Sequence, residues 1–482
     1  ERLNLLIINT LGKKSDSAMN AKYYLLAAFL VGVLFLVFIY LILIFFGLSN
    51  IYSSVFDVNH SFLFDFSTEH GKQAMWIGVS LFLGLIILLL DGNFIIKHSY
   101  WIYGVTMLLL LLVLFTAPIH GARSWFGFGG VGIQPAEFAK VGVCMALSRH
   151  LSVKGSTKKR RQDSKGFTIG GLINYIINSI QTESRTLLIL ALPSILVLLQ
   201  PDAGTFIIFT SFILVLYREG YAGNILLFGI VSVIIAVITL LVADATFFLP
   251  FTQVMLSGKF GIFLILLIIG FIFFLIIKQF VLPRQRKNLY KALIGSIVIS
   301  VIFINFVEIG YSNILKPHQK TRIDLVLGKI QDPNGDGYNI NRAKAAIGSG
   351  GFLGKGYKEA KLANASQKHV PEQSTDFIFC TWSEERGFVG SFFLVIIYMA
   401  LLIKIILIAE RQRSSFTRIY AYAVAGIFFY HFMINIGMAI GLAPVIGIPL
   451  PFFSYGGSGM MSFSILIFIL LKLDSERKTV LH

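Results

Sequence analysis

Residues 369–387 read HVPEQSTDFIFCTWSEERG, and residues 388–409 continue as FVGSFFLVIIYMALLIKIILIA, so an acid-rich polar stretch leads directly into a long apolar run. About 20 apolar residues in a helix span the hydrocarbon core of a bilayer. Carboxylates close to a bilayer are costly unless they are paired or have a function. The apolar run therefore predicts a membrane-spanning helix, and the acids before it are candidates for a functional site on the membrane surface.

The composition of the whole chain extends this interpretation. Of 482 residues, 56% are hydrophobic and only 13% are charged, with a mean hydropathy of +0.78. A soluble core of this size does not need so much apolar surface. We therefore predict an all-α polytopic membrane protein. The two cysteines, Cys144 and Cys380, lie in apolar runs and indicate buried free thiols, not a disulfide framework.

The chain contains about twelve apolar runs of suitable length. The fifth and sixth are short and are separated by Gln200-Pro201-Asp202, which makes their boundaries the least certain. The predicted spans are 23–47, 73–91, 99–118, 134–151, 186–200, 203–217, 222–243, 259–281, 290–315, 388–409, 416–441 and 454–473.

The distribution of Lys and Arg tests this count, because basic residues concentrate in cytoplasmic segments. With the N-terminus inside, the inner segments hold 23 Lys and Arg, whereas the short outer loops hold only Lys72 and Arg123. This asymmetry predicts that both termini are cytoplasmic. The run Lys158-Lys159-Arg160-Arg161 then indicates a topology anchor beside anionic lipid, and we expect no nucleic-acid binding despite the net charge of +17.

The spans divide the chain into four parts. Residues 1–22 form a cytoplasmic segment, which has no apolar core and so predicts no cleavable signal peptide; the missing initial Met indicates a processed, tagged or trimmed start. Residues 23–315 hold nine spans and a basic cytoplasmic loop at 152–185. One large extracytoplasmic loop at 316–387 carries 11 Lys/Arg and 8 Asp/Glu. Because long loops between spans are usually functional or disordered, we expect the catalytic or binding chemistry there. Residues 388–482 add three spans and a short cytoplasmic tail.

Two motifs in the large loop resemble known sites and fail on inspection. The stretch from Asp332 to Gly337 begins like a calcium-binding EF-hand loop, but the twelfth position is Ala343 instead of a bidentate Glu, so a turn is expected. The glycine-rich stretch Gly348–Gly356 matches neither a Walker motif nor a dinucleotide fingerprint, so no nucleotide cofactor is expected. Its consecutive backbone N–H groups remain candidates for an anion-binding nest.

Charged residues inside the predicted spans are the next candidates. Glu137 and Lys140 share a helix face after Pro135 and are either a structural ion pair or a group that grips a charged headgroup. Asp202 either faces a cavity or caps the sixth span. Arg123, close to Trp125, is either an interfacial anchor or a phosphate contact.

Asp376 precedes the tenth span. From the residues alone, an ordinary acid in the first turn of a helix explains Asp376 as well as a catalytic group does. Glu308 and Asp91 are interpreted as structural.

Together these segments resemble the SEDS family (shape, elongation, division and sporulation) of bacterial peptidoglycan glycosyltransferases, and the loop at 335–339 and the motif ending at Gly457 look most like its elongation branch, RodA. The matching segments occur in family order over residues 50–474. They are Gln73, Gly121-Ala-Arg123-Ser-Trp125, Ile133-Gln-Pro-Ala-Glu137-Phe-Ala-Lys140, Gln200-Pro-Asp202-Ala-Gly204, Asp332–Gly356, Val370-Pro-Glu372-Gln-Ser-Thr-Asp376-Phe-Ile-Phe, Glu384-Glu385-Arg-Gly387-Phe, and Gly441–Ser458.

The resemblance implies roles for single residues. Asp376 corresponds to the essential catalytic carboxylate, and Glu137, Lys140 and Asp202 would line the same central cavity, with Arg123 as a further substrate contact. Two departures stand out. Gly132 replaces a basic residue that members often have, and members usually have ten spans, so twelve imply an extra helix pair within 222–281. An even insertion preserves the orientation of all later spans.

The resemblance also implies the reaction. The substrate would be lipid II, whose polymerisation on the outer face of the bacterial cytoplasmic membrane inverts the anomeric carbon, with Asp376 as general base. Lys140, Arg123 or a divalent cation, Mg²⁺ or Mn²⁺, held by Glu137 and Asp202, would stabilise the leaving pyrophosphate. The implied partners are a class B penicillin-binding protein, other membrane proteins of the elongation complex, and membrane lipids.

Two alternatives stay open at this stage. A transporter or lipid flippase also has about twelve spans with charges and Pro-broken helices inside the membrane. A division polymerase of the FtsW type shares the motifs above.

Overall fold

The computed structural model describes residues 34–55, 64–118, 123–128, 131–155, 169–220, 223–242, 246–248, 255–314, 317–327, 329, 336–362 and 372–477. Several predictions concern residues outside these ranges. They are the cytoplasmic segment 1–22, the basic run Lys158–Arg161, the turn predicted from Asp332, the stretch 369–371 and the end of the C-terminal tail.

Every one of the twelve predicted spans contains a helix within the described ranges, and the sequence break at Pro201 separates α6 from α7. In chain order these helices are Leu34–Ser54, α2 Glu69–Leu89, α4 Ser99–Leu112 with the 3₁₀ turn η2 Val113–Phe115, α5 Pro135–Gly155, α6 Ile169–Leu199, α7 Ala203–Thr210 with α8 Phe212–Arg218, α9 Gly223–Val242, α10 Gly258–Phe280, α11 Pro283–Ile309 with the π turn η3 Gly310–Ile314, α14 Ile378–Glu410, α15 Ser415–Ile440 and α16 Gly457–Ser475.

Length and apolar composition confirm the fold class. Seven of the described helices are long and apolar enough to cross a membrane, and four shorter apolar helices accompany them at 99–115, 184–199, 203–218 and 231–242. The remaining predicted span, α5, carries Glu137 and Lys140 and is therefore less apolar. The protein is an all-α multi-pass membrane protein.

Several boundaries differ from the prediction. The loop predicted at 152–185 is helical at both ends, since α5 continues to Gly155 and α6 begins at Ile169. The large loop at 316–387 contains two helices, α12 Pro317–Val326 and α13 Asp336–Ser349. Hydropathy located the apolar spans but could not detect polar helices that continue beyond the hydrocarbon core.

The start of α14 also differs. The helix begins at Ile378, ten residues before the predicted span, and is kinked at Gly387, where the backbone adopts φ 63° and ψ −161°. Only Gly adopts this conformation readily. The predicted span at 388–409 therefore corresponds to the helix after the kink, and residues 378–386 form a short buried helix before it.

Three small elements complete the fold. The short helix α3 Gly92–Lys97 follows α2, and its N-terminus is capped by Asp91. Strands β1 Phe126–Phe128 and β2 Val131–Ile133 form an antiparallel hairpin that leads into α5. A second antiparallel hairpin, β3 Thr246–Phe248 and β4 Met255–Ser257, joins α9 to α10.

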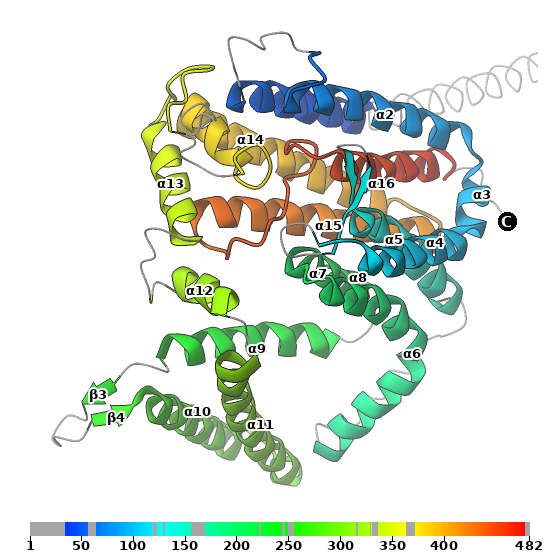
Figure 1. The fold of residues 1–482 in the computed structure, drawn as a ribbon. Helices are drawn as coiled ribbons and strands as arrows, with labels where there is room; N and C mark the ends of the chain where they lie inside the picture. Colours follow the sequence, from blue (N-terminus) through cyan, green and yellow to red (C-terminus); the bar gives the residue numbers. More distant parts are fainter. Residues whose placement is uncertain are drawn as a thin grey trace, which may run out of the picture.

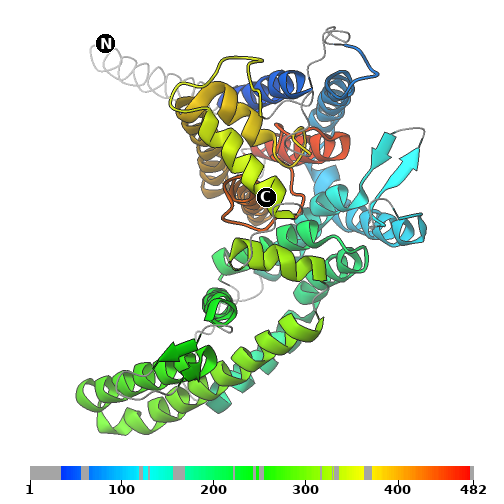
Figure 2. The same ribbon diagram turned by 60° about the vertical axis from the view of Figure 1, so that its left-hand side comes forward.

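The helices form two regions of different packing (Figure 1). A core bundle contains the helix Leu34–Ser54 together with α2, α4, α5, α14, α15 and α16. In the apolar stretches of α15 and α16, 72% and 83% of the residues are buried by other parts of the protein. Helices α10 and α11 have only 11% and 6% buried, and both views show them lying away from the bundle (Figure 2). Most of the α10 and α11 surface is therefore available to lipid.

Candidate functional site

A small pocket of about 130 Å³ lies in the core bundle and brings together segments that are far apart in the sequence. Asp376 lines it from the segment before α14, and Gln134 and Glu137 line it from the start of α5. Trp125 comes from the loop before β1. The rest of the wall comes from the loop between α15 and α16 and from the first turns of α16, including Gly447, Ser454 and Phe463.

Asp376 lies outside the helix that follows it, because Phe377 is the N-cap of α14. The interpretation of Asp376 as an acid in the first helical turn is therefore wrong, and its side chain lines the pocket instead. The opposite wall is close: a Cβ atom at Gly447 would lie 3.4 Å from Asp376 Oδ2.

The backbone around Asp376 is held from three sides. Asn435 of α15 donates one hydrogen bond to the Asp376 carbonyl (2.9 Å) and another to the Ile448 carbonyl (2.8 Å). Ser454 Oγ donates to the Thr375 carbonyl (2.6 Å). The N–H of Tyr455 donates to Ser374 (2.8 Å). These bonds fix the carboxylate-bearing segment to the loop that forms the opposite wall of the pocket.

Glu137 and Lys140 form a buried ion pair on the first turns of α5. Lys140 Nζ lies 2.8 Å from Glu137 Oε2, and the exposed fractions of the two side chains are 0% and 6%. Ser462 of α16 also donates to Glu137 Oε2 (3.1 Å). Glu137 lines the pocket, whereas Lys140 lies behind it and lines no part of the pocket.

The second contact of Lys140 is His431 of α15, at 2.9 Å from Nε2. His431 Nδ1 lies 2.9 Å from the Pro449 carbonyl, which can only accept a hydrogen bond. Nδ1 therefore carries the proton, and Nε2 accepts one from Lys140. The ammonium also lies 4.7 Å from the centre of the Phe463 ring. Lys140 thus links α5, α15 and α16 beneath the pocket.

His431 and Asn435 were missed in the sequence. They are four residues apart on one face of α15, inside an otherwise apolar span. Both side chains are almost completely buried. Two polar residues at helical spacing in a membrane span were the available signal.

Asp202 and Arg123 lie beside the pocket and do not line it. Asp202 caps α7: its carboxylate accepts hydrogen bonds from the N–H and the hydroxyl of Thr205 (both 2.9 Å). Gln134 Nε2, on the pocket wall, donates to the same carboxylate (3.0 Å). Arg123 is exposed and donates to the Leu114 carbonyl (3.3 Å). The capping interpretation of Asp202 therefore agrees with its contacts, and Gln134 connects it to the site.

The donor set for a divalent cation is incomplete. No group of three or more His, Cys, Asp or Glu side chains gathers at one point among the described residues. Both Asp202 oxygens already accept hydrogen bonds, and Glu137 Oε2 is bound by Lys140 and Ser462. In this arrangement Glu137 and Asp202 do not form a protein-only cation site.

Lys355 of the glycine-rich stretch and the residues that follow it bind two carboxylates of the chain itself. The buried Glu384 accepts hydrogen bonds from Lys355 Nζ (2.6 Å) and from the N–H groups of Lys361 and Leu362 (both 3.0 Å). Glu385 accepts from the N–H of Lys358 (2.9 Å) and from the Ser53 hydroxyl. Within the glycine-rich stretch the N–H groups of Lys355 and Gly356 donate to the Glu384 and Glu385 carbonyls (both 3.0 Å). These contacts anchor the start of α14, and an anion-binding nest within Gly348–Gly356 stays a prediction.

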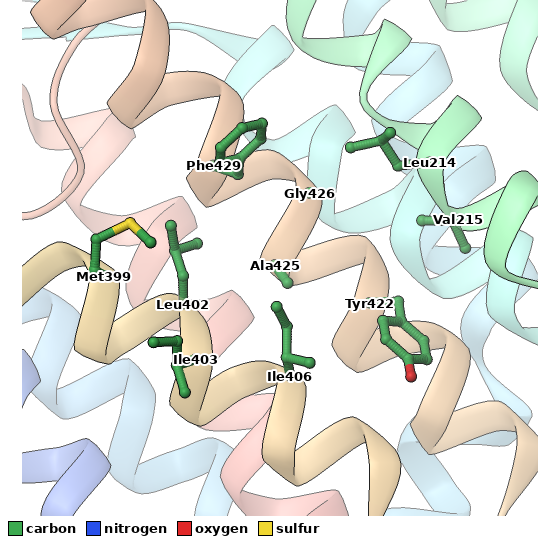
Figure 3. Close-up of a pocket in the computed structure, with 10 residues that line it drawn as sticks. All are labelled: Leu214, Val215, Met399, Leu402, Ile403, Ile406, Tyr422, Ala425, Gly426 and Phe429. Carbon is green, nitrogen blue, oxygen red and sulfur yellow. The ribbon is translucent and has the colours of Figure 1, made fainter. Parts of the chain in front are cut away.

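A second pocket, of about 330 Å³, has a different character (Figure 3). It lies between α8, α14 and α15, and apolar side chains such as Leu214, Ile406 and Phe429 form nearly all of its wall. Tyr422 is the only lining residue with an ionisable side chain. The lining of the second pocket therefore contains no carboxylate, imidazole or amine side chain, whereas the Asp376 pocket is lined by two carboxylates.

The fold and the Asp376 pocket define a multi-pass helical membrane protein in which the partly buried Asp376 and the buried Glu137 line one pocket of the core bundle. The sequence profile of the FtsW/RodA/SpoVE family, described as cell cycle proteins, matches residues 33–250 and 297–479. The chain belongs to this family, which confirms the resemblance noted from the motifs.

Two curated relatives and one solved structure are similar over most of the chain. Peptidoglycan glycosyltransferase RodA of Treponema pallidum is 29% identical over 85% of this chain and 90% of its own length. Peptidoglycan glycosyltransferase MrdB of Escherichia coli is 28% identical over 78% of each chain. A solved structure described as the structural coordination of polymerization and crosslinking by a peptidoglycan synthase complex contains a chain with a TM-score of 0.60 and 23% identity, covering 92% of this chain and 97% of the other.

The family match leaves residues 251–296 uncovered. This segment contains all of α10 and the first part of α11. Of the extra helix pair predicted within 222–281, which is α9 and α10, only α10 lies in the uncovered segment, because α9 lies within the family match. The second helix of that segment is the first part of α11, which begins after residue 281. We refer to α10 and α11 as the inserted hairpin.

Proposed function

We propose that this protein is a peptidoglycan glycosyltransferase that polymerises lipid II into glycan strands on the outer face of the cytoplasmic membrane during cell elongation. One observation carries the proposal: the Asp376 carboxylate lines a pocket together with Glu137, in a chain whose relatives are named peptidoglycan glycosyltransferases. The membrane orientation, with both termini in the cytoplasm, rests on the Lys and Arg asymmetry.

In the proposed reaction the C4 hydroxyl of one sugar attacks the anomeric carbon of another. The bond from the anomeric carbon to the lipid pyrophosphate breaks as the new C–O bond forms, so the configuration inverts. Asp376 accepts the hydroxyl proton, and the lipid pyrophosphate leaves with the electron pair of the broken bond. General-base help of this kind contributes typically about 10²–10⁴-fold to a rate.

The remaining candidates support this step in different ways. Lys140 neutralises Glu137 and, through His431, holds the Pro449 segment, so it shapes the pocket from behind. Arg123 is exposed near the pocket residue Trp125 and is our candidate for a contact to the pyrophosphate. Asp202 positions Gln134 on the pocket wall.

A requirement for Mg²⁺ or Mn²⁺ remains a prediction. Because both Asp202 oxygens and Glu137 Oε2 already accept hydrogen bonds, we propose that any such ion binds with the substrate pyrophosphate and not to the empty protein. Polymerisation measured across a titration of each ion, after removal of metals by a chelator, tests this.

The proposed partner is a class B penicillin-binding protein, together with other membrane proteins of the elongation complex. Support comes from the similar chain in the peptidoglycan synthase complex, which coordinates polymerization with crosslinking. Co-purification from membranes with an affinity-tagged chain tests the partner without relying on activity.

The decisive experiment incubates the purified protein with labelled lipid II and measures glycan length on a gel, alone and with candidate partners. Asp376→Ala should abolish polymer formation while the protein still inserts and folds. Asp91→Asn, which alters an acid that caps the distant helix α3, is the matched control and should leave polymerisation intact. Wild-type polymer yield from Asp376→Ala would reject the assignment. Transbilayer movement of lipid II without any new glycosidic bond would instead support a flippase.

A further inference from the structure

The glycine-rich turn at 350–356 packs directly against the kink in α14. A Cβ atom at Gly354 would lie 2.1 Å from the Glu385 carbonyl oxygen, and one at Gly387 would lie 2.3 Å from the Gly354 nitrogen. Gly354 also has φ +85°, which favours Gly. The turn and the start of the apolar half of α14 are therefore in close backbone contact.

The same turn caps the helix after the kink. The N–H groups of Phe388 and Val389 donate to the carbonyls of Gly351 (2.9 Å) and Phe352 (3.2 Å). Such N–H groups at the beginning of a helix have no partner within the helix. In return, the N–H of Lys355 donates to the Glu384 carbonyl (3.0 Å). These hydrogen bonds fix the position of the turn along the axis of α14, next to the kink.

The tip of the turn is apolar and exposed. Phe352 and Leu353 have exposed fractions of 67% and 78%. Phe352 stacks on Phe388 with ring centres 5.9 Å apart, and Phe388 stacks on Phe392 at 6.1 Å. Phe388 and Phe392 are themselves 60% and 55% exposed on the membrane-spanning helix. An uninterrupted row of aromatic rings thus connects the turn to the lipid-facing surface of α14.

The side chains behind the tip are polar and aromatic. Lys355 bonds to Ser349 and Glu384. The Arg386 guanidinium lies 4.3 Å from the centre of the Trp382 ring and 5.8 Å from that of Tyr357. Trp382 is itself buried, but Tyr357 is 45% exposed, and cations with an exposed Tyr behind an apolar tip are the composition expected at the headgroup level of a bilayer.

We propose that the tip Phe352–Leu353 is inserted into the acyl region of the leaflet beside the kink of α14. The occupant of this apolar surface is membrane lipid, because the surface continues without interruption into the lipid-facing side of α14. The proposal depends on the membrane location of α14 and not on the reaction at Asp376.

Depth-dependent quenching tests the proposal on the full chain. Leu353→Cys is labelled with bimane and reconstituted into vesicles of phosphatidylglycerol and phosphatidylethanolamine, with or without lipids brominated on the acyl chain. The matched control is Ala345→Cys, an exposed position on α13. The native Cys144 and Cys380 are fully buried, so the unsubstituted chain gives the labelling background.

Brominated lipid should quench the label at 353 several-fold more strongly than the label at 345, and aqueous iodide should show the reverse order. Equal iodide quenching at both positions would overturn the proposal, since the tip would then lie in water. Protection of position 353 from both quenchers would also overturn it, because protein would cover the tip. Phe352→Cys provides a second label at the tip if Leu353→Cys does not fold.

Discussion

Two of the Lys–Glu ion pairs in the described part of the chain lie in completely different surroundings. Glu137 and Lys140 lie in the core bundle with exposed fractions of 6% and 0%, within a network that reaches α15 and α16. Lys259 and Glu308 join α10 to α11 in the inserted hairpin and are 36% and 34% exposed. We therefore expect a Lys–Glu ion pair to affect the free energy of unfolding strongly in the core bundle and weakly in the inserted hairpin.

This contrast follows the extent of the family match. The residues around the Asp376 pocket lie inside the family match, whereas most of the inserted hairpin lies outside it. Since α10 and α11 are two consecutive helices of spanning length, passing through both returns the chain to the same side of the membrane before α14. A family member can thus acquire extra membrane surface without altering the pocket.

The largest expected effect comes from Lys140→Met. This change leaves Glu137 charged and buried without its cation, and breaking a buried pair from one side costs about 3–5 kcal/mol. The free energy of unfolding of the purified protein should fall by that amount, and polymerisation should be lost. The double variant Glu137→Gln/Lys140→Met removes both charges of this buried pair. The free energy of unfolding should therefore recover, whereas polymerisation should not. An unchanged stability in the single variant would show that Glu137 is solvated or protonated.

A smaller effect is expected for Asn435→Ala, which removes the two hydrogen bonds to the Asp376 and Ile448 carbonyls. At about 0.5–1.5 kcal/mol for each bond, the loss of stability should be roughly 1–3 kcal/mol. Polymerisation should slow because the Asp376 backbone is no longer fixed. Asn305→Ala in α11 is the matched control, since that exposed side chain bonds only to Val301 of its own helix. Equal effects of the two variants on unfolding and rate would contradict the proposed role of Asn435.

The smallest effect is expected for Lys259→Met in the inserted hairpin. Exposed ion pairs contribute about 0–1 kcal/mol, so the unfolding free energy should change by about 1 kcal/mol or less. Polymer length should remain that of the unsubstituted chain, as measured in the same gel assay. If Lys259→Met lowered the free energy of unfolding as much as Lys140→Met, the inserted hairpin and the core bundle would be energetically coupled. The two ion pairs would then not differ in their effect on stability.

The sequence predicted the spans well for a simple physical reason. A chain segment in lipid must satisfy its backbone hydrogen bonds internally, so a long apolar run in a membrane protein forms a helix. The twelve helices and the break at Pro201 were found in this way. The start of α14 at Ile378 was not, since residues 378–386 are buried by neighbouring protein and not by lipid. Hydropathy alone cannot distinguish these two environments.

The site was predicted only in part. Physical reasoning on the residues left Asp376 ambiguous, and the family resemblance gave it a catalytic role that remains a prediction. The network beneath the pocket could not be predicted, because Lys140 and His431 are 291 positions apart and meet only through the packing of α5 on α15. Burial of Lys140 behind Glu137 likewise depends on helices that lie far away in the sequence.

The walls of the Asp376 pocket come from the start of α5, from the segment before α14 and from the last loop and helix of the chain. Residues 447–463 are synthesised after Glu137 and Asp376. A partly synthesised chain therefore has Glu137 and Asp376 but no enclosed space between them. The pocket can therefore form only after residues 447–463 have been synthesised, more than 300 positions after the start of α5.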